Sequence, residues 1–214
     1  AILDFTSGQM CSVFGHNHPD ILAAMEQAGT RAIHLLSTML SPELIALGKT
    51  LSELLPKGLD RSIFLNTGSE SNEVALRMAK LHTGGFEIVG FAGSWHGMPG
   101  SLMLPAPYAY RCPIQHCQGT CDNSCLEFGM KMVDQQSVGA YAAMIAEPVL
   151  SAAGIIELPP AYLKRLKELC DERGLLLIFD EAQTGLGRLG QNFALEGYEL
   201  TPDFLTLSKT LGGG

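Results

Sequence analysis

Apolar and polar positions follow two different periods along this chain, and the alternation between them predicts its elements. Short runs that are almost wholly apolar predict buried strands at 62–65, 86–91, 142–146, 175–179 and 204–207. Stretches with apolar residues at helical spacing predict helices at 20–33, 41–55, 71–82, 124–137 and 160–173. Because strands and helices alternate, we expect an α/β fold, with a mostly parallel sheet and helices on both of its faces. Residues 1–20 and 100–123 lack such a pattern and are expected to be irregular.

The composition is that of a globular protein with a substantial core. Of the 214 residues, 46% are apolar and 17% are charged, which suffices for one α/β domain. The net charge of −8 is spread along the chain without a basic stripe, so we expect no nucleic-acid partner. No apolar run approaches the length of a membrane span, so we expect no membrane insertion.

The cysteines and the chain ends bear on location and completeness. A chain with a large core does not need disulfides, so its six cysteines favour a reducing compartment. We expect the cytoplasm, with the mitochondrion as the alternative because a targeting segment could have been removed. The chain begins at Ala1 without a signal-peptide pattern and stops inside a glycine-rich turn. We therefore expect a fragment of a longer polypeptide.

Two charged residues stand near the carboxyl ends of predicted strands, where open parallel sheets bind ligands. Asp180 follows the run 175–179, and Lys209 follows shortly after the run 204–207. An amine and a carboxylate on one edge suit pyridoxal phosphate (PLP), which needs a lysine for a Schiff base and an acid against its pyridinium nitrogen. Taken singly, Asp180 could instead cap a helix or bind a metal, and Lys209 could be a solvated surface charge.

Further residues at predicted strand ends are candidates for the same site. The turn 67–69 (Thr-Gly-Ser) precedes a helix, where close backbone approach and free N–H groups suit a phosphate; the alternative is an ordinary capped turn. Trp95 could stack on a cofactor ring or fill a core or interface position. Gln183 could hydrogen-bond the phenolic oxygen of the cofactor, and Glu147 ends another strand at the same edge.

Four cysteines cluster within fourteen residues: Cys112, Cys117, Cys121 and Cys125. Thiolates suit zinc or an iron–sulfur cluster. The spacing matches no standard CxxC pair, however, so free thiols or an oxidation-sensitive patch are favoured over a metal.

Six stretches together resemble the class III PLP-dependent aminotransferases, and within them the branch of 2,2-dialkylglycine decarboxylase, a decarboxylating transaminase. The resemblance runs along nearly the whole chain, and the Asp-Glu-x-Gln-x-Gly pattern with a later Ser-Lys is its most specific part. The stretches are 66–73 (NTGSESNE), 94–98 (SWHGM), 146–148 (AEP), 154–159 (GIIELP), 180–188 (DEAQTGLGR) and 206–209 (TLSK).

The resemblance implies a role for each matching position. Lys209 would hold the cofactor and shuttle protons, Asp180 would pair with the pyridine nitrogen, Trp95 would stack on the ring, and Gln183 would contact the phenolic oxygen. The full set of implied cofactor contacts is Thr67, Gly68, Ser69, Asn72, Trp95, Glu147, Asp180, Ala182, Gln183 and Lys209.

The same resemblance implies further features of the site and the assembly. Gln9 falls near the carboxylate that is lost in decarboxylation, and Leu35 and Ser37 match part of an alkali-metal site. The implied fold is that of the fold-type I transferases, as a dimer or tetramer that acts on an amino acid and a 2-oxo acid. Residues 1–40 would lead into a PLP-binding large domain at 41–214, with the family's small C-terminal domain absent.

Three departures from the family pattern leave the reaction open. The stretch between the Trp-His-Gly motif and Pro105 is shorter than in decarboxylase-like enzymes, Ala152 stands where they have a serine, and the chain stops just past Lys209. A decarboxylating transaminase, a plain class III ω-aminotransferase and a truncated chain without catalysis all remain. A metal-binding module centred on the cysteines is the weakest alternative.

Overall fold

The computed structural model describes residues 2–36, 38–97, 102–112, 114, 117 and 120–213. These residues form two compact units. One comprises residues 65–208, and the other comprises residues 1–64 together with 209–214.

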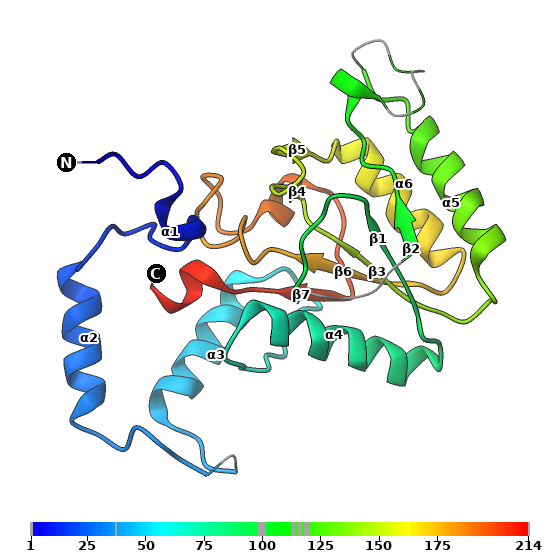
Figure 1. The fold of residues 1–214 in the computed structure, drawn as a ribbon. Helices are drawn as coiled ribbons and strands as arrows, with labels where there is room; N and C mark the ends of the chain where they lie inside the picture. Colours follow the sequence, from blue (N-terminus) through cyan, green and yellow to red (C-terminus); the bar gives the residue numbers. More distant parts are fainter. Residues whose placement is uncertain are drawn as a thin grey trace. The chain divides into compact units, whose positions relative to one another are not determined.

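The larger unit is built on a parallel sheet of five strands (Figure 1). Its order is β2-β1-β3-β6-β7, and every neighbouring pair is parallel. The strands are β1 (Glu87–Phe91), β2 (Leu102–Leu104), β3 (Tyr141–Ala146), β6 (Leu176–Asp180) and β7 (Phe204–Thr206). A small antiparallel pair, β4 (Val149–Leu150) and β5 (Ile156–Glu157), stands apart. The predicted α/β fold with a mostly parallel sheet is confirmed.

Three helices cover the two faces of this sheet: α4 (Gly68–Thr83), α5 (Ser124–Gln136) and α6 (Pro160–Asp171). Because side chains alternate along a strand, Ile88 and Phe91 point to opposite faces. Ile88 packs in a buried cluster with Ala75 and Leu76 of α4. The Phe91 ring instead lies 6.0 Å from the Tyr162 ring of α6. Helix α4 therefore lies on one face, and α6 lies on the other (Figure 1).

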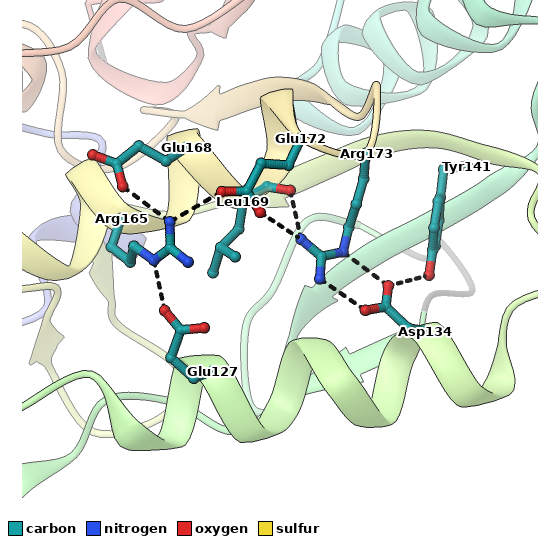
Figure 2. Close-up of polar contacts among 8 residues, drawn as sticks. All are labelled: Glu127, Asp134, Tyr141, Arg165, Glu168, Leu169, Glu172 and Arg173. Carbon is teal, nitrogen blue, oxygen red and sulfur yellow. Dashed lines mark hydrogen bonds and ion pairs between the residues drawn. The ribbon is translucent and has the colours of Figure 1, made fainter.

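Two groups of ion pairs join α5 to α6 (Figure 2). Arg165 of α6 binds Glu127 of α5, and Arg173, in the turn just after α6 ends at Asp171, binds Asp134 of α5. The Arg173 contact is bidentate, with N···O distances of 2.7 and 2.8 Å. Tyr141 donates its hydroxyl to the same Asp134 carboxylate at 2.9 Å. The two contacts therefore hold α5 against both the helix α6 and the turn that follows it.

The smaller unit contains α1 (Ser7–Met10), α2 (Pro19–Gly29), α3 (Pro42–Leu54) and a 3₁₀ turn at Lys209–Gly212. Among the residues of α1, α2 and α3, only Leu51 is buried. Ser41 caps α3, because its hydroxyl accepts the Leu44 N–H at 3.1 Å. The helices of this unit therefore bury few residues, although the N-terminus of α3 is capped.

Four predicted elements differ from the structure. No strand forms at 62–65, where Ile63 is 60% exposed and no neighbouring strand supplies hydrogen bonds. The stretch 100–123, predicted to be irregular, contributes β2 at the sheet edge. The helix predicted at 20–33 begins at Pro19 and ends already at Gly29, and the His18 side chain caps it by accepting the Asp20 N–H. The helix predicted from residue 71 begins at Gly68.

Candidate functional site

The order of the strands marks one place in the sheet where a ligand site is expected. The chain proceeds from β1 to β2 in one direction and from β3 through β6 to β7 in the other. The carboxyl ends of β1 and β3 therefore flank a topological switch point, where open α/β sheets bind ligands. The backbone N–H of Trp95, after β1, donates to Glu147 Oε1, after β3, at 2.7 Å. This hydrogen bond bridges the switch point.

Asp180 is the centre of a buried polar network at this edge. It is the last residue of β6 and is 4% exposed. Its Oδ2 lies 2.8 Å from both Asn72 Nδ2 and His96 Nδ1, and its Oδ1 accepts the Ala182 N–H at 3.0 Å. Because a carboxylate only accepts, the proton on the His96 ring lies on Nδ1 in this contact. Three donors thus compensate the burial of one negative charge.

Asn72 connects this carboxylate to two other segments. Its Nδ2 also donates to the His96 backbone carbonyl at 3.0 Å. Its Oδ1 accepts the Thr206 hydroxyl at 2.6 Å. Asn72 and Thr206 are each 3% exposed, so the amide has no bulk water to bind instead. All three polar groups of the amide are therefore committed to the protein.

Glu147 and Glu181 are further buried acids near this edge. Burial raises the pKa of the Glu147 carboxyl, and the Trp95 N–H opposes that rise. Burial also raises the pKa of Glu181, which accepts backbone N–H groups from Ala194 and Leu195 at 2.7 and 2.8 Å. Glu181 therefore holds the loop after β6 in place, whereas Glu147 positions the backbone of Trp95.

The turn at the start of α4 has the properties of a phosphate cradle. Thr67 and Glu70 form a capping box, with the Glu70 N–H donating to Thr67 Oγ1 at 3.1 Å. A side chain on Gly68 would place its Cβ 2.9 Å from Ser208 Cβ. A Cβ on Gly97 would lie 2.5 Å from Ser69 Oγ, at a φ of +95°. Because neither glycine has a side chain, the turn at the start of α4 lies close both to the loop after β1 and to the segment after β7.

Several residues of the larger unit have hydrogen-bonding atoms that no described residue uses, and these atoms fit PLP. Asp180 Oδ1 receives only the Ala182 N–H from the described residues, which leaves room for a ring N–H. The side-chain oxygen of Gln183 is buried and has no hydrogen-bond partner among the described residues. The N-terminal N–H groups of α4 suit a phosphate. Trp95 is 63% exposed, so its ring is open to contact with another group.

The structure brings most of the predicted cofactor contacts together at this edge, through the carboxyl ends of β1, β3 and β6 and the N-terminus of α4. Lys209 belongs to the other unit, and its covalent link to Ser208 ties it to the end of β7. Its φ of +46° is rare for a residue with a side chain and is typical of functional sites. Gln9 and Leu35 also belong to that unit, and Ser37 lies outside the described residues.

The cysteine cluster and the helices bear on the requirements for a metal site and for a membrane span. Within the described part of the chain, no group of three or more His, Cys, Asp or Glu side chains could hold a metal ion. Neighbouring thiols and burial raise the pKa of Cys125 to about 12, with burial the larger cause. No helix among the described residues is long and apolar enough to cross a membrane. The alkali-metal site at Leu35 and Ser37 stays a prediction.

The geometry agrees with what comparison with known proteins reveals. The model of the family "Aminotransferase class-III" matches residues 1–214. This chain belongs to the class III aminotransferases. An uncharacterized aminotransferase of Schizosaccharomyces pombe is 48% identical over 235 residues, which cover 100% of this chain and 52% of the relative. The acetylornithine aminotransferase of Methanopyrus kandleri is 36% identical, over 99% of this chain and 54% of its own.

Solved structures of transaminases have the same fold. An (S)-enantioselective omega-transaminase from Thermomicrobium roseum superposes with a TM-score of 0.87 at 28% identity, over 99% of this chain and 54% of that one. A PLP-bound amine transaminase from an uncultivated Pseudomonas species gives 0.88 at 27% identity, over 100% and 55%. The chain spans about half the length of the relatives it matches.

Three buried polar residues in or beside the Asp180 network were given no role from the sequence. Thr206 and His96 occur in the motifs that carry the family resemblance but received no role, and Glu181 received none although it is 1% exposed. For Thr206, the available signal was its position as a polar residue at the end of a short apolar strand. His96 gave none, because sequence spacing does not reveal which acid a histidine ring meets.

Proposed function

We propose that the protein containing this chain is a PLP-dependent aminotransferase that moves an amino group from an amino acid to a 2-oxo acid. The observation that carries the proposal is Asp180, a buried carboxylate held by three donors at the switch point of the sheet. Family membership and the fold agree with it. We propose residues 41–214 as the PLP-binding domain and a homodimer or tetramer as the assembly.

Each residue has a defined task in this proposal. Bound PLP supplies a ring that accepts electrons from the substrate carbon. Lys209 would hold the cofactor through its amine and carry protons to and from the substrate. Asp180 would keep a proton on the ring nitrogen, because an opposite charge favours the protonated form. The α4 N-terminus at Gly68 and Ser69 would bind the phosphate, with Trp95 against the ring and Gln183 at its phenolic oxygen.

Decarboxylation is the second candidate, and one observation favours it. Ser7, Gly8, Gln9 and Met10 all have left-handed backbone conformations, with φ of 52°, 55°, 62° and 65°. Such strain is typical of functional loops. The Asp4 carboxylate accepts the N–H groups of Thr6, Ser7 and Gly8 and holds the turn in place. Gln9 is the residue that we propose near the carboxylate to be lost.

The test is the visible absorption spectrum of the natural polypeptide with added PLP, before and after the change Lys209→Ala. We expect a band that shifts on addition of 2-aminoisobutyrate and is lost in the variant. Lys57→Ala, which changes an exposed lysine, is the matched control and should retain the band. Release of CO2 would favour the decarboxylase, and a shift without CO2 the plain transaminase. No band in the unsubstituted protein would favour a non-catalytic role.

A further inference from the structure

We propose that Thr206 is a positioning residue for this site: its hydroxyl anchors the Asn72 amide, which in turn holds Asp180 in place. The inference rests on the proposed function, because it concerns the carboxylate assigned to the PLP ring nitrogen. Thr206 would not touch the cofactor. It would act through two successive hydrogen bonds, from Thr206 to Asn72 and from Asn72 to Asp180.

The geometry identifies Asn72 as the partner of the Thr206 hydroxyl. Thr206 lies opposite Asp180 in the β6–β7 register and is 3% exposed. Its Oγ1 lies 2.6 Å from Asn72 Oδ1 and 3.5 Å from the Phe179 carbonyl oxygen. A hydroxyl has one proton to donate, and hydrogen bonds weaken at the longer distance. The proton therefore goes to Asn72.

The hydrogen bonds of the Asn72 NH2 group show why its carbonyl oxygen needs the Thr206 hydroxyl. Its NH2 group donates to two acceptors, the His96 carbonyl and Asp180 Oδ2. These acceptors decide which end of the amide faces Asp180, but they leave its carbonyl oxygen without a partner. A buried carbonyl oxygen without a donor costs about 1–3 kcal/mol. Without the Thr206 hydroxyl, the side chain would therefore move toward another donor and lengthen its bond to Asp180.

Loosening that bond has a spectroscopic consequence. A carboxylate that accepts fewer hydrogen bonds competes more strongly for a nearby proton. Asp180 would then draw the proton away from the ring nitrogen of bound PLP. The ring would withdraw fewer electrons from its substituents, so the pH midpoint of the PLP absorption band should rise. A purely structural role for Thr206 would not move that midpoint.

The experiment uses the natural polypeptide loaded with PLP and two substitutions at one position. Thr206→Val removes the hydroxyl and keeps the branched shape, whereas Thr206→Ser keeps the hydroxyl. We measure the pH midpoint of the absorption band and the dissociation constant for PLP. We expect Thr206→Val to raise the midpoint and to raise the dissociation constant by about tenfold, the equivalent of about 1.4 kcal/mol. Thr206→Ser should stay close to the unsubstituted protein in both.

Thr184→Val is the matched control, because Thr184 is another buried threonine whose hydroxyl binds a buried acid. It is 5% exposed and donates to Glu181 Oε2 at 3.2 Å. We expect it to lower the melting temperature without moving the midpoint. Should Thr206→Val fail to fold, Thr206→Ala is measured in the same way.

Three results would overturn the inference. One is a Thr206→Val protein with an unchanged midpoint and PLP affinity. Another is a shift of equal size in Thr184→Val, since that would be a general effect of destabilisation. If the unsubstituted protein binds PLP while Thr206→Val behaves normally, the inference fails and the proposed function stands. A lack of any PLP band in the unsubstituted protein overturns both.

Discussion

Two aspartates of the larger unit lie in polar networks that differ in one respect. Asp134 binds the Arg173 guanidinium through two hydrogen bonds and also accepts the Tyr141 hydroxyl. Asp180 accepts hydrogen bonds from an amide, an imidazole and a backbone N–H. Among the described residues, no lysine or arginine forms a hydrogen bond or ion pair with Asp180. The Asp134 charge is therefore neutralised within the chain, whereas the Asp180 charge is only solvated by dipoles and the His96 ring.

The difference separates a structural network from a binding network. The side chain of Asp134 is 39% exposed, so water would tolerate its charge even without a partner. Asp180 is 4% exposed, and a buried charge without a full counter-charge is costly. In the proposed function, the protonated ring nitrogen of PLP would supply that counter-charge. This is the physical basis for assigning Asp180, and not Asp134, to the cofactor.

The comparison is tested most strongly by removing each carboxylate in turn. We expect Asp180→Ala to lower kcat/KM for transamination by at least about 100–1000-fold, because it removes preorganised electrostatic stabilisation. Asp134→Ala should change kcat/KM by no more than about twofold. Steady-state kinetics at saturating PLP measure both. Comparable losses in the two variants would show that the distinction between the networks is wrong.

The second test concerns stability, to which the Asp134–Arg173 ion pair should contribute more than an exposed ion pair does. A bidentate, partly buried ion pair is stronger than an exposed one, so Asp134→Ala should lower the free energy of unfolding by about 1–2 kcal/mol. Lys49→Ala breaks the exposed pair with Glu53, whose side chains are 75% and 65% exposed, and should cost less than about 0.5 kcal/mol. Urea denaturation measures both. An Asp134→Ala protein as stable as Lys49→Ala would contradict this prediction.

The smallest expected effect is an opposite dependence on pH. The Arg173 hydrogen bond lowers the pKa of Asp134 from 3.8, so its stabilising contribution is present above pH 3.8 and is lost as the pH falls through the lowered pKa. Burial raises the pKa of Glu147 from 4.5, so its contribution is present below pH 4.5 and is lost as the pH rises through the raised pKa. Relative to the unsubstituted protein, Glu147→Gln should gain stability with rising pH and Asp134→Asn should lose it. Unfolding free energies from pH 3 to 7 measure the two slopes, and slopes of the same sign would refute the assignment.

The larger unit was predictable because its strands bury both faces and its motifs are local. The apolar run at 175–179 indicated a strand, and β6 forms at Leu176–Asp180. The turn at 67–69 was predicted together with the helix that follows it. The run at 62–65 misled because a short apolar run has no decisive period, and pairing depends on neighbours that are distant in sequence. Strand β2 was missed for the same reason, since its partner β1 determines it.

The site was predictable in its members but not in its connections. Sequence position places Asp180 and Asn72 near the sheet edge, but only the fold shows that one amide links the carboxylate to His96 and Thr206. The tie between Trp95 and Glu147 spans 52 residues of sequence. Such pairings depend on the order of the strands, which local patterns do not specify.

The placement of Trp95 has a practical consequence for optical work. It is the only tryptophan of the chain, and its backbone is hydrogen-bonded to a buried glutamate while its side chain is 63% exposed. Excitation at the red edge of protein absorption therefore excites Trp95 selectively, at the switch point of the sheet. Its emission is a built-in reporter there, sensitive to polarity and to any nearby chromophore that absorbs in the near ultraviolet. No label need be attached to follow events at this edge of the sheet.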